Sequence, residues 1–338
     1  MVNTLEVIQA WGKTLAGHKP SLSIEITKEC PLRCPGCYAY ADGHVGPGAN
    51  LRDLSDQRGD ALVRDFLAVV DEYRPLHLSI VGGDPLVRFR ELSALLPELE
   101  KRGIFVQVVT SAFRQIPPQW AGIPKLGIVV SIDGLQPEHD VRRKPATYER
   151  ILNNIAGHRI TVHCTITAQM MDRPGYLDEF LRFWSAREEV RKVWMSMFTP
   201  QVGEVAAEIL SPAQRAQCVA DLRRLRTVYP KLDMYDAQIR EFAHPPTSPD
   251  ECIFAKTTTV ISADLKTVVT PCQLGGNPDC SQCGCVASMG LAAVGHHHLA
   301  LGLTAGKIFE LSNKAGTQIR KWRERHGKRE PKVAWQST

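Results

Sequence analysis

Short β-branched segments alternate with amphipathic segments of helical periodicity through the first two-thirds of the chain. Six strands are expected, at residues 21–27, 77–81, 104–110, 126–132, 160–167 and 192–198. Helices are expected between them, at residues 60–73, 88–102, 148–156 and 176–186. Because crossovers of this length join parallel strands, the order predicts an α/β fold with a parallel sheet, as either a doubly wound sheet or a partial (β/α)6 barrel.

The pattern changes after Pro200. A helix is expected at residues 211–228, since Ser211 is a good N-cap and Pro212 suits the first helical position. A short helix at 236–242 and a proline-rich connector at 244–250 follow, and the connector is the expected domain boundary. Residues 257–262 and 267–270 predict a small hairpin, cysteine-rich loops come next, and a basic helix is expected from about residue 307 to 326.

Composition and charge exclude several classes of protein. The formal net charge of +5 is too mild for a dedicated nucleic-acid binder, and no apolar run approaches the ~18 residues of a membrane span. Residues 1–20 lack the pattern of a secretory signal, so a cytoplasmic protein is expected. The basic C-terminal helix is expected to be a solvated face, with contact to an acidic lipid surface or protein as the minority alternative.

Ten cysteines stand out against this background, and eight of them form two groups. Disulfides are not expected in a reducing compartment, so clustered cysteines indicate metal ligands. The remaining two, Cys164 and Cys218, lie in an expected strand and an expected helix and suit buried positions.

The first group is Cys30, Cys34 and Cys37, in a C-x3-C-x2-C pattern directly after the first expected strand. Three thiolates on such a short loop can hold one face of a 4Fe–4S cluster and leave the fourth iron open to another ligand. A zinc site that borrows a distant fourth ligand is the alternative.

This motif, followed by the aromatic Tyr38, resembles that of the radical S-adenosylmethionine (SAM) enzymes. Other segments that follow expected strands also resemble that family: Gly82-Gly83-Asp84-Pro85, Ser131 and Asp133 in Ser-Ile-Asp-Gly, Arg143 after His139-Asp140, and the pair Thr165 and Thr167. The resemblance implies that these segments contact SAM. Asp84 replaces the family's glutamate, which leaves a carboxylate contact there in question. Each segment also has a purely structural interpretation, because Gly-Gly and Asp-Gly favour tight turns.

The resemblance implies a definite chemistry on a partial (β/α)6 barrel. A reduced 4Fe–4S cluster on Cys30, Cys34 and Cys37 donates an electron to SAM, and the resulting 5′-deoxyadenosyl radical removes a hydrogen atom from an unactivated C–H bond. A flavodoxin or a ferredoxin is the implied electron donor.

The second group surrounds the expected hairpin. Cys252 precedes it, Cys272 follows it, and Cys280, Cys283 and Cys285 come next. This arrangement resembles the SPASM and twitch domains of radical SAM enzymes. It implies a second, auxiliary 4Fe–4S cluster on Cys252, Cys272, Cys280 and Cys283, with Cys285 as the substitute ligand. A zinc ribbon is the alternative.

Five parts are therefore expected: an N-terminal helix (1–17), a radical SAM core domain (18–205), a helical linker (206–248), a SPASM/twitch-like auxiliary-cluster domain (249–300), and a basic helix and tail (301–338). The expected function is a radical SAM enzyme that acts on a C–H bond of a small or lipid-like substrate, because no peptide-recognition domain is seen before residue 18. A maturase of a ribosomal peptide is the alternative within the family. A non-catalytic iron–sulfur or zinc protein is the alternative outside it.

Overall fold

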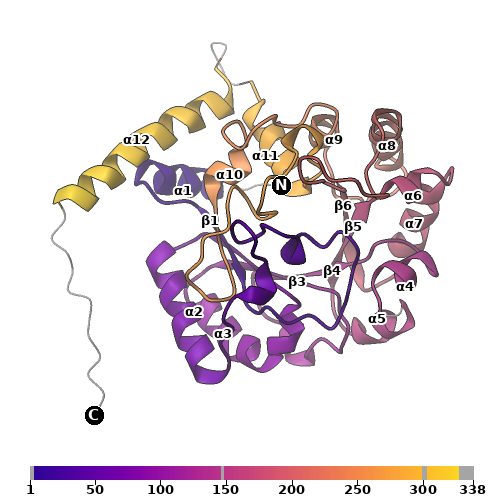
Figure 1. Ribbon diagram of the computed structural model, residues 1–338, viewed down its shortest axis with the longest axis horizontal. Helices are drawn as coiled ribbons and strands as arrows, with labels where there is room; N and C mark the ends of the chain where they lie inside the picture. Colours follow the sequence, from indigo (N-terminus) through magenta and orange to yellow (C-terminus); the bar gives the residue numbers. More distant parts are fainter. Residues whose placement is uncertain (1–3, 146–147, 299–302, 327–338) are drawn as a thin grey trace.

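A seven-stranded parallel sheet organises the chain (Figure 1). The computed structural model describes residues 4–145, 148–298 and 303–326. The strands are β1 (Ser21–Glu25), β2 (His77–Val81), β3 (Phe105–Thr110), β4 (Leu126–Ser131), β5 (Ile160–Ile166), β6 (Val190–Met197) and β7 (Thr258–Ile261). Their order is β6-β5-β4-β3-β2-β1-β7, and each pairing between them is parallel. Since β1 to β6 are neighbours in chain order, without the reversal of a doubly wound sheet, the partial barrel is confirmed.

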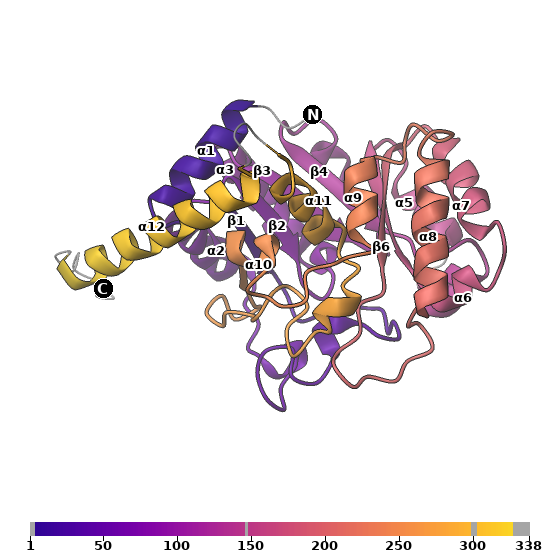
Figure 2. The same cartoon turned by 90° about the horizontal axis from the view of Figure 1, so that it is seen from above.

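Helices follow the strands and lie around the outside of the sheet (Figure 2). They are α2 (Gly59–Tyr73), α3 (Phe89–Lys101), α4 (Glu138–Arg142), α5 (Tyr148–Asn154), α6 (Ala168–Met171) and α7 (Tyr176–Ser185). In α2 the residues Leu62, Phe66 and Val70 are buried at a spacing of four, which is the apolar face that its periodicity predicts. The expected helices of the barrel are thus present, with ends that differ by a few residues.

Strand β7 differs from the sequence prediction of a hairpin in a separate domain. Val260 and Ile261 are buried, and β7 pairs in parallel with β1 from Ser21 opposite Thr258 onward. The return arm of the hairpin is short, with an antiparallel bridge between Ile261 and Val268. The physical reason is that β1 would otherwise present an unpaired edge, which a strand of β-branched residues can cover. The connector at 244–250 therefore does not separate two independent sheets.

The segment between β6 and β7 contains the two expected helices, α8 (Pro212–Leu225) and α9 (Asp236–Glu241). Ser211 caps α8 as predicted, since its hydroxyl accepts from the Gln214 N–H in a reciprocal capping box. Two helices after α9 were not expected, α10 (Ile253–Thr257) and α11 (Val286–Gly295), and neither were the short α4 and α6 of the barrel. The small apolar residues of α11 show no amphipathic period, so the sequence gives no helix signal there.

Helices from the two ends of the chain pack together. The α1 helix (Thr4–Leu15) lies beside α12 (Ala305–His326), and α12 extends away from the body of the barrel in both views (Figures 1 and 2). Gly316 allows this approach, because a Cβ there would lie 1.9 Å from the Thr14 carbonyl oxygen. Among the described residues, none of the helices combines the length and the apolar character that crossing a bilayer requires.

A buried carboxylate connects the sheet to the C-terminal segment. Glu25, the last residue of β1, is fully buried, and its Oε1 lies 2.8 Å from Nε2 of His44. Its Oε2 accepts a 2.5 Å hydrogen bond from the Ser262 hydroxyl, at the end of β7. The other ring nitrogen of His44 lies 3.1 Å from the Leu274 carbonyl oxygen. Both imidazole nitrogens thus face acceptors, which suits the protonated ring.

We expect His44→Gln to destabilise the fold in a pH-dependent manner. Burial by itself lowers the pKa of His44, but the hydrogen bond to Glu25 and its charge raise it above the ordinary value. A raised pKa stabilises the folded state fully below the unfolded value of about 6.5, and this contribution is lost as the pH rises through the folded pKa. The variant should lose about 3 kcal/mol of unfolding free energy at low pH.

Denaturant titrations across pH measure this loss. The difference between wild type and His44→Gln should shrink as the pH rises, whereas the exposed His297→Gln control should show no difference. A difference that grows with pH would contradict the ion pair.

Candidate functional site

The first cysteine group lies on the loop that leaves the carboxyl end of β1. A cavity of about 700 Å³ is lined by this loop and its neighbours: Cys30, Leu32, Arg33, Cys34, Pro35, Gly36, Cys37, Tyr40, Ala41 and Arg52. All three cysteines of the motif therefore line one cavity. Among the described residues, no group of three or more His, Cys, Asp or Glu side chains converges on the position of a single metal ion.

The three thiols share a low-polarity environment. Burial raises the pKa of Cys30 to about 12, and it also raises the pKa values of Cys34 and Cys37. The guanidinium of Arg143 acts in the opposite direction on Cys34 and Cys37. A metal must displace these protons, so metal binding and proton release are coupled at this loop. A set of three soft thiolates on one loop fits a three-cysteine 4Fe–4S cluster.

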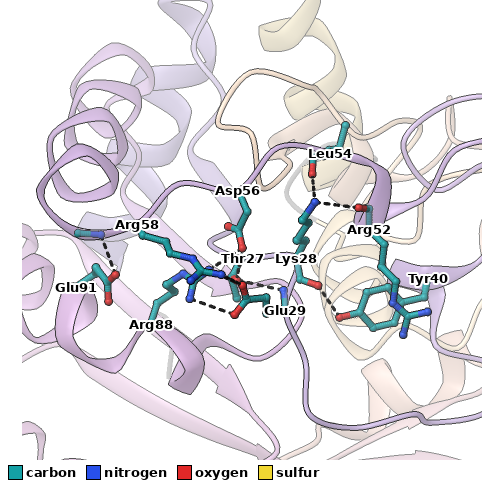
Figure 3. A network of polar contacts seen from close by, with 11 residues as sticks. Thr27, Lys28, Glu29, Tyr40, Arg52, Leu54, Asp56, Arg58, Arg88 and Glu91 are labelled. Atoms are coloured by element: carbon teal, nitrogen blue, oxygen red, sulfur yellow. Dashed lines mark hydrogen bonds and ion pairs between the residues drawn. The ribbon is translucent and has the colours of Figure 1, made fainter.

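A polar network holds the segment before Cys30 (Figure 3). Arg88, which is nearly fully buried, contacts Asp56 at 2.6 Å, and Asp56 accepts a 2.9 Å hydrogen bond from the Thr27 hydroxyl. Glu29 pairs with Arg58 and with Arg88. The network fixes the backbone direction from which the cysteine loop starts.

A second set of contacts in the same view holds the far side of the loop (Figure 3). The Lys28 ammonium donates to the carbonyl oxygens of Arg52 and Leu54, and the Tyr40 hydroxyl donates to the Lys28 carbonyl at 3.0 Å. Tyr40 lies just after Cys37, so this hydrogen bond closes the loop back onto its own start.

The glycine pair after β2 packs directly on this segment. A Cβ on Gly83 would lie 2.1 Å from the Glu29 carbonyl oxygen, and Gly82 has φ +134°, a conformation that favours glycine. The Gly83 N–H donates to the Thr27 carbonyl at 2.7 Å, and the Asp84 N–H donates to that of Glu29 at 2.8 Å. The structure thus brings both glycines to the root of the cysteine loop and gives them a packing role.

The carboxylate of Asp84 is saturated by the protein itself. It is buried and accepts hydrogen bonds from the Leu86 N–H, the Thr110 hydroxyl, and the N–H and hydroxyl of Ser111. Burial nevertheless raises its pKa. These contacts cap the turn after β2 and tie it to the end of β3, so the side chain is not available to a ligand in this arrangement.

Asp133 and Arg143 form a buried ion pair beside the first cysteine group. Asp133 Oδ2 lies 2.9 Å from Arg143 and 3.3 Å from Nε of Arg142, and Oδ1 accepts a 3.0 Å hydrogen bond from the Thr165 N–H. Burial would raise the pKa of Asp133, but the charges of Arg143 and Arg142 lower it to about 2. Burial lowers the pKa of Arg143, whereas Asp133, Cys34 and Cys37 raise it. The Asp133–Arg143 ion pair therefore lies near those two thiols.

The other two positions predicted at this edge lie on the same strands. Ser131 ends β4 and is buried, whereas Thr167 is buried at the start of α6 without a hydrogen bond from its side chain to the helix. Thr165 takes part through its backbone N–H. The structure therefore brings Ser131, Asp133, Arg143 and Thr165 together at one end of the sheet, and Thr167 lies directly after β5 as the N-cap of α6.

Arg142 and Glu208 were missed by the sequence analysis, whereas His139 lies in a segment that it named. Arg142 bridges Asp133 and Glu208, with a 2.9 Å contact to the Glu208 carboxylate. Glu208 lies 66 residues away on the segment before α8, and no motif marks it. His139 accepts a 3.1 Å hydrogen bond from the Asp133 N–H, and burial lowers its pKa to about 4, so the ring is neutral.

The second cysteine group gathers Cys252, Cys272, Cys280 and Cys283. Burial raises the pKa of Cys272 to about 12 and that of Cys280 to about 11, and the nearby thiols of Cys252 and Cys283 raise both values further. Cys285 is near Cys283 and Cys272. Four soft donors are the ligand set of an iron–sulfur cluster, whereas among the described residues no three of them converge on the position of a single zinc ion.

The barrel positions this second group. Arg215 on α8 donates to the carbonyl oxygens of Phe242, Gln282 and Cys283. Gly284 lies so close to β6 that a Cβ would be 2.0 Å from the Met197 carbonyl oxygen. The loop between Cys283 and Cys285 therefore rests on the end of the last barrel strand.

Tyr38 connects the two cysteine groups. Its hydroxyl accepts a 3.1 Å hydrogen bond from Nε2 of Gln273, the residue after Cys272. Burial raises the pKa of Tyr38, and the nearby thiols of Cys37 and Cys285 raise it further. Groups that are more than 200 residues apart in the sequence are thus neighbours in the fold.

Comparison with known families agrees with this geometry. A family model described as the Radical SAM superfamily matches residues 24–182. The match covers the first cysteine group and the strands up to β5, and it ends before the second group. Residues 24–182 thus match a Radical SAM superfamily domain. A search of curated proteins found no significant match.

Solved structures with a similar fold include enzymes with bound S-adenosylmethionine. Streptococcus suis SuiB bound to S-adenosylmethionine has a TM-score of 0.53 at 18% identity, over 77% of this chain and 62% of SuiB. The chain thus spans less than two-thirds of the length of SuiB. SuiB bound to the precursor peptide SuiA has a TM-score of 0.51 at 16% identity, over 77% of this chain and 61% of that one. Native anSMEcpe with bound AdoMet has a TM-score of 0.56 at 12% identity, over 90% of this chain and 97% of that one. At such low sequence identities, the structural similarity shows a shared fold.

We expect Asp133→Asn to destabilise the protein, because it leaves two partly buried arginines without their carboxylate. A folded pKa of about 2 lies below the ordinary value, so the contribution of Asp133 is present above about pH 4 and is lost as the pH falls through the folded value. The variant should lose about 2 kcal/mol of unfolding free energy at neutral pH. Asp65→Asn, which breaks an exposed pair with Arg64, is the matched control and should lose much less.

Metal analysis separates the two cysteine groups. Anaerobically reconstituted wild type should contain about eight irons, and the triple change of Cys30, Cys34 and Cys37 to Ala should leave about four. The remaining iron should then depend on the other group, so replacing Cys272, Cys280 and Cys283 by Ala should leave the first cluster in place. One equivalent of zinc without iron in the first variant would instead indicate a zinc ribbon.

Proposed function

We propose that this protein is a radical SAM enzyme that removes a hydrogen atom from a C–H bond of a small or lipid-like substrate. The observation that carries the proposal is the shared cavity of Cys30, Cys34 and Cys37 at the carboxyl end of β1, within the range that matches the family model. In (β/α) barrels, this end of the strands is where active sites form.

The cofactor supplies the reactive step, and the chain supplies the environment. Cys30, Cys34 and Cys37 would hold a 4Fe–4S cluster, which when reduced would supply the single electron that splits the C5′–S bond of SAM into methionine and the 5′-deoxyadenosyl radical that takes the hydrogen atom. Arg143 places a buried positive charge beside Cys34 and Cys37, which stabilises their thiolate form. Asp133 balances that charge, so the arginine remains buried without an unpaired cation.

The proposed SAM contacts are Tyr38, Gly82, Gly83, Asp84, Ser131, Asp133, Arg143, Thr165 and Thr167. Their location around the carboxyl ends of β1, β2, β4 and β5 supports a single ligand site. Gly82 and Gly83 would act through backbone groups. Asp84 would act through its backbone as well, since its carboxylate is fully hydrogen-bonded.

The second cysteine group would hold an auxiliary 4Fe–4S cluster on Cys252, Cys272, Cys280 and Cys283, as in a SPASM/twitch-type enzyme. Four thiolates leave no open iron, so this cluster would exchange electrons with the substrate rather than bind SAM. Its proximity to the first group through Tyr38 supports such an exchange and a reaction with net oxidation.

Electrons would reach the first cluster from an acidic flavodoxin or ferredoxin. The exposed Arg33 and Arg52 line the mouth of the cavity and present the complementary charge.

A peptide substrate is the second candidate. It is favoured by one observation, the structure of SuiB bound to the precursor peptide SuiA, whose fold resembles that of this chain. The reaction at the cluster would be the same, and only the occupant of the substrate site would change.

Release of 5′-deoxyadenosine tests the assignment. With dithionite and SAM under anaerobic conditions, the reconstituted protein should cleave SAM slowly even without substrate. Cys34→Ala should abolish the release, because two thiols of the loop cannot hold the cluster. Cys218→Ala, at a buried cysteine outside both groups, should retain it.

Two outcomes would contradict the proposal. Cleavage that persists in Cys34→Ala would remove the catalytic cluster from this loop. An iron-loaded wild type that neither binds nor cleaves SAM would indicate a non-catalytic iron–sulfur protein.

A further inference from the structure

A stripe of exposed apolar side chains runs along α12. Leu311 is 58% exposed, Ile319 39% and Trp322 62%. At 100° per residue these positions fall within about 80° of the helix circumference, with Ala315 between them. Large exposed apolar side chains that share one face of a helix indicate a contact surface for another molecule or for a membrane.

A neighbouring face of α12 is already occupied. Phe309 and Gly316 are buried, and Gly316 packs against the backbone of α1 near Thr14. The stripe is therefore turned away from the contact with α1. Figures 1 and 2 both show the helix extending from the barrel, so the stripe is accessible along the projecting part.

A row of cations flanks the stripe. Lys307, Lys314, Lys321 and Arg325 are exposed and lie within about 40° of one another on the side of the helix away from α1. The segment Ala305–His326 contains six Lys and Arg against two Glu, a net charge of +4, whereas the whole chain carries +5. The basic excess of the protein is thus concentrated on this helix and the residues after it.

We propose that α12 docks on an anionic phospholipid surface. A helix that lies in the plane of a membrane interface buries its apolar stripe among the acyl chains and sets its lysines against the lipid phosphates. The stripe and the cation row of α12 lie side by side, as this geometry requires. Trp322 also suits an interface, because its ring is apolar while its indole N–H is polar.

This surface chemistry favours lipid over the alternatives. Nucleic acid would use the cations but leave the apolar stripe in water. A second copy of the chain would cover the stripe but bring two cation rows together. An anionic membrane satisfies both features with one contact. The inference does not depend on the proposed reaction.

Vesicle sedimentation tests the proposal with the full-length, iron-loaded protein. It should sediment with vesicles of phosphatidylcholine and phosphatidylglycerol in equal parts, but not with phosphatidylcholine alone, and salt should weaken the binding. Replacing Lys314 and Lys321 by Gln should weaken binding roughly tenfold or more. Replacing Ile319 and Trp322 by Ser should abolish it, because the apolar contribution is lost.

Control variants remove exposed charges or an exposed apolar side chain at positions outside α12. The pair Arg64→Gln and Lys101→Gln removes two exposed charges from α2 and α3, and Val228→Ser removes an exposed apolar side chain after α8. Both should bind like wild type. Equal binding to both vesicle types, binding that survives the α12 changes, or no binding at all would overturn the proposal. Self-association that depends on Trp322, without vesicle binding, would assign the surface to a second copy.

Discussion

The buried carboxylate of Glu25 is the interaction on which the arrangement of both cysteine groups depends. It ends the first barrel strand, pairs with His44 on the far side of the first cysteine loop, and accepts the hydroxyl of Ser262 where β7 ends. One uncompensated charge at this position would be costly, so each of the two partners is needed. The same carboxylate therefore orients the loop of the first group and anchors the segment that leads to the second.

Charge compensation also governs the region around the thiols of the first cysteine group. The thiols of Cys30, Cys34 and Cys37 share one region, so their thiolate charges would repel one another and favour the protonated form. Arg143 reduces this repulsion beside Cys34 and Cys37, and Asp133 with Arg142 and Glu208 keeps the arginines from being isolated cations. The buried polar residues around the cavity therefore act as one charge-compensated unit.

Local signals allowed much of this to be predicted. Periodicity and caps predicted the barrel strands and the start of α8, and the C-x3-C-x2-C spacing singled out three cysteines that line one cavity. What the sequence missed depends on tertiary contacts. Strand β7 forms because β1 has a free edge, and Glu208 joins the site only through the fold. The small residues of α11 have no periodicity that could reveal a helix.

The late position of β7 in the sequence also determines the order in which the sheet and the first cysteine loop are completed during synthesis. The edge of β1 is not covered, and Glu25 does not receive its second partner, until residues 258–262 have left the ribosome. During synthesis the barrel strands β1 to β6 are therefore complete well before the first cysteine loop has all of its supports. A growing chain thus exposes its N-terminal thiols in an unfinished setting, and final packing around them waits for the C-terminal third of the protein.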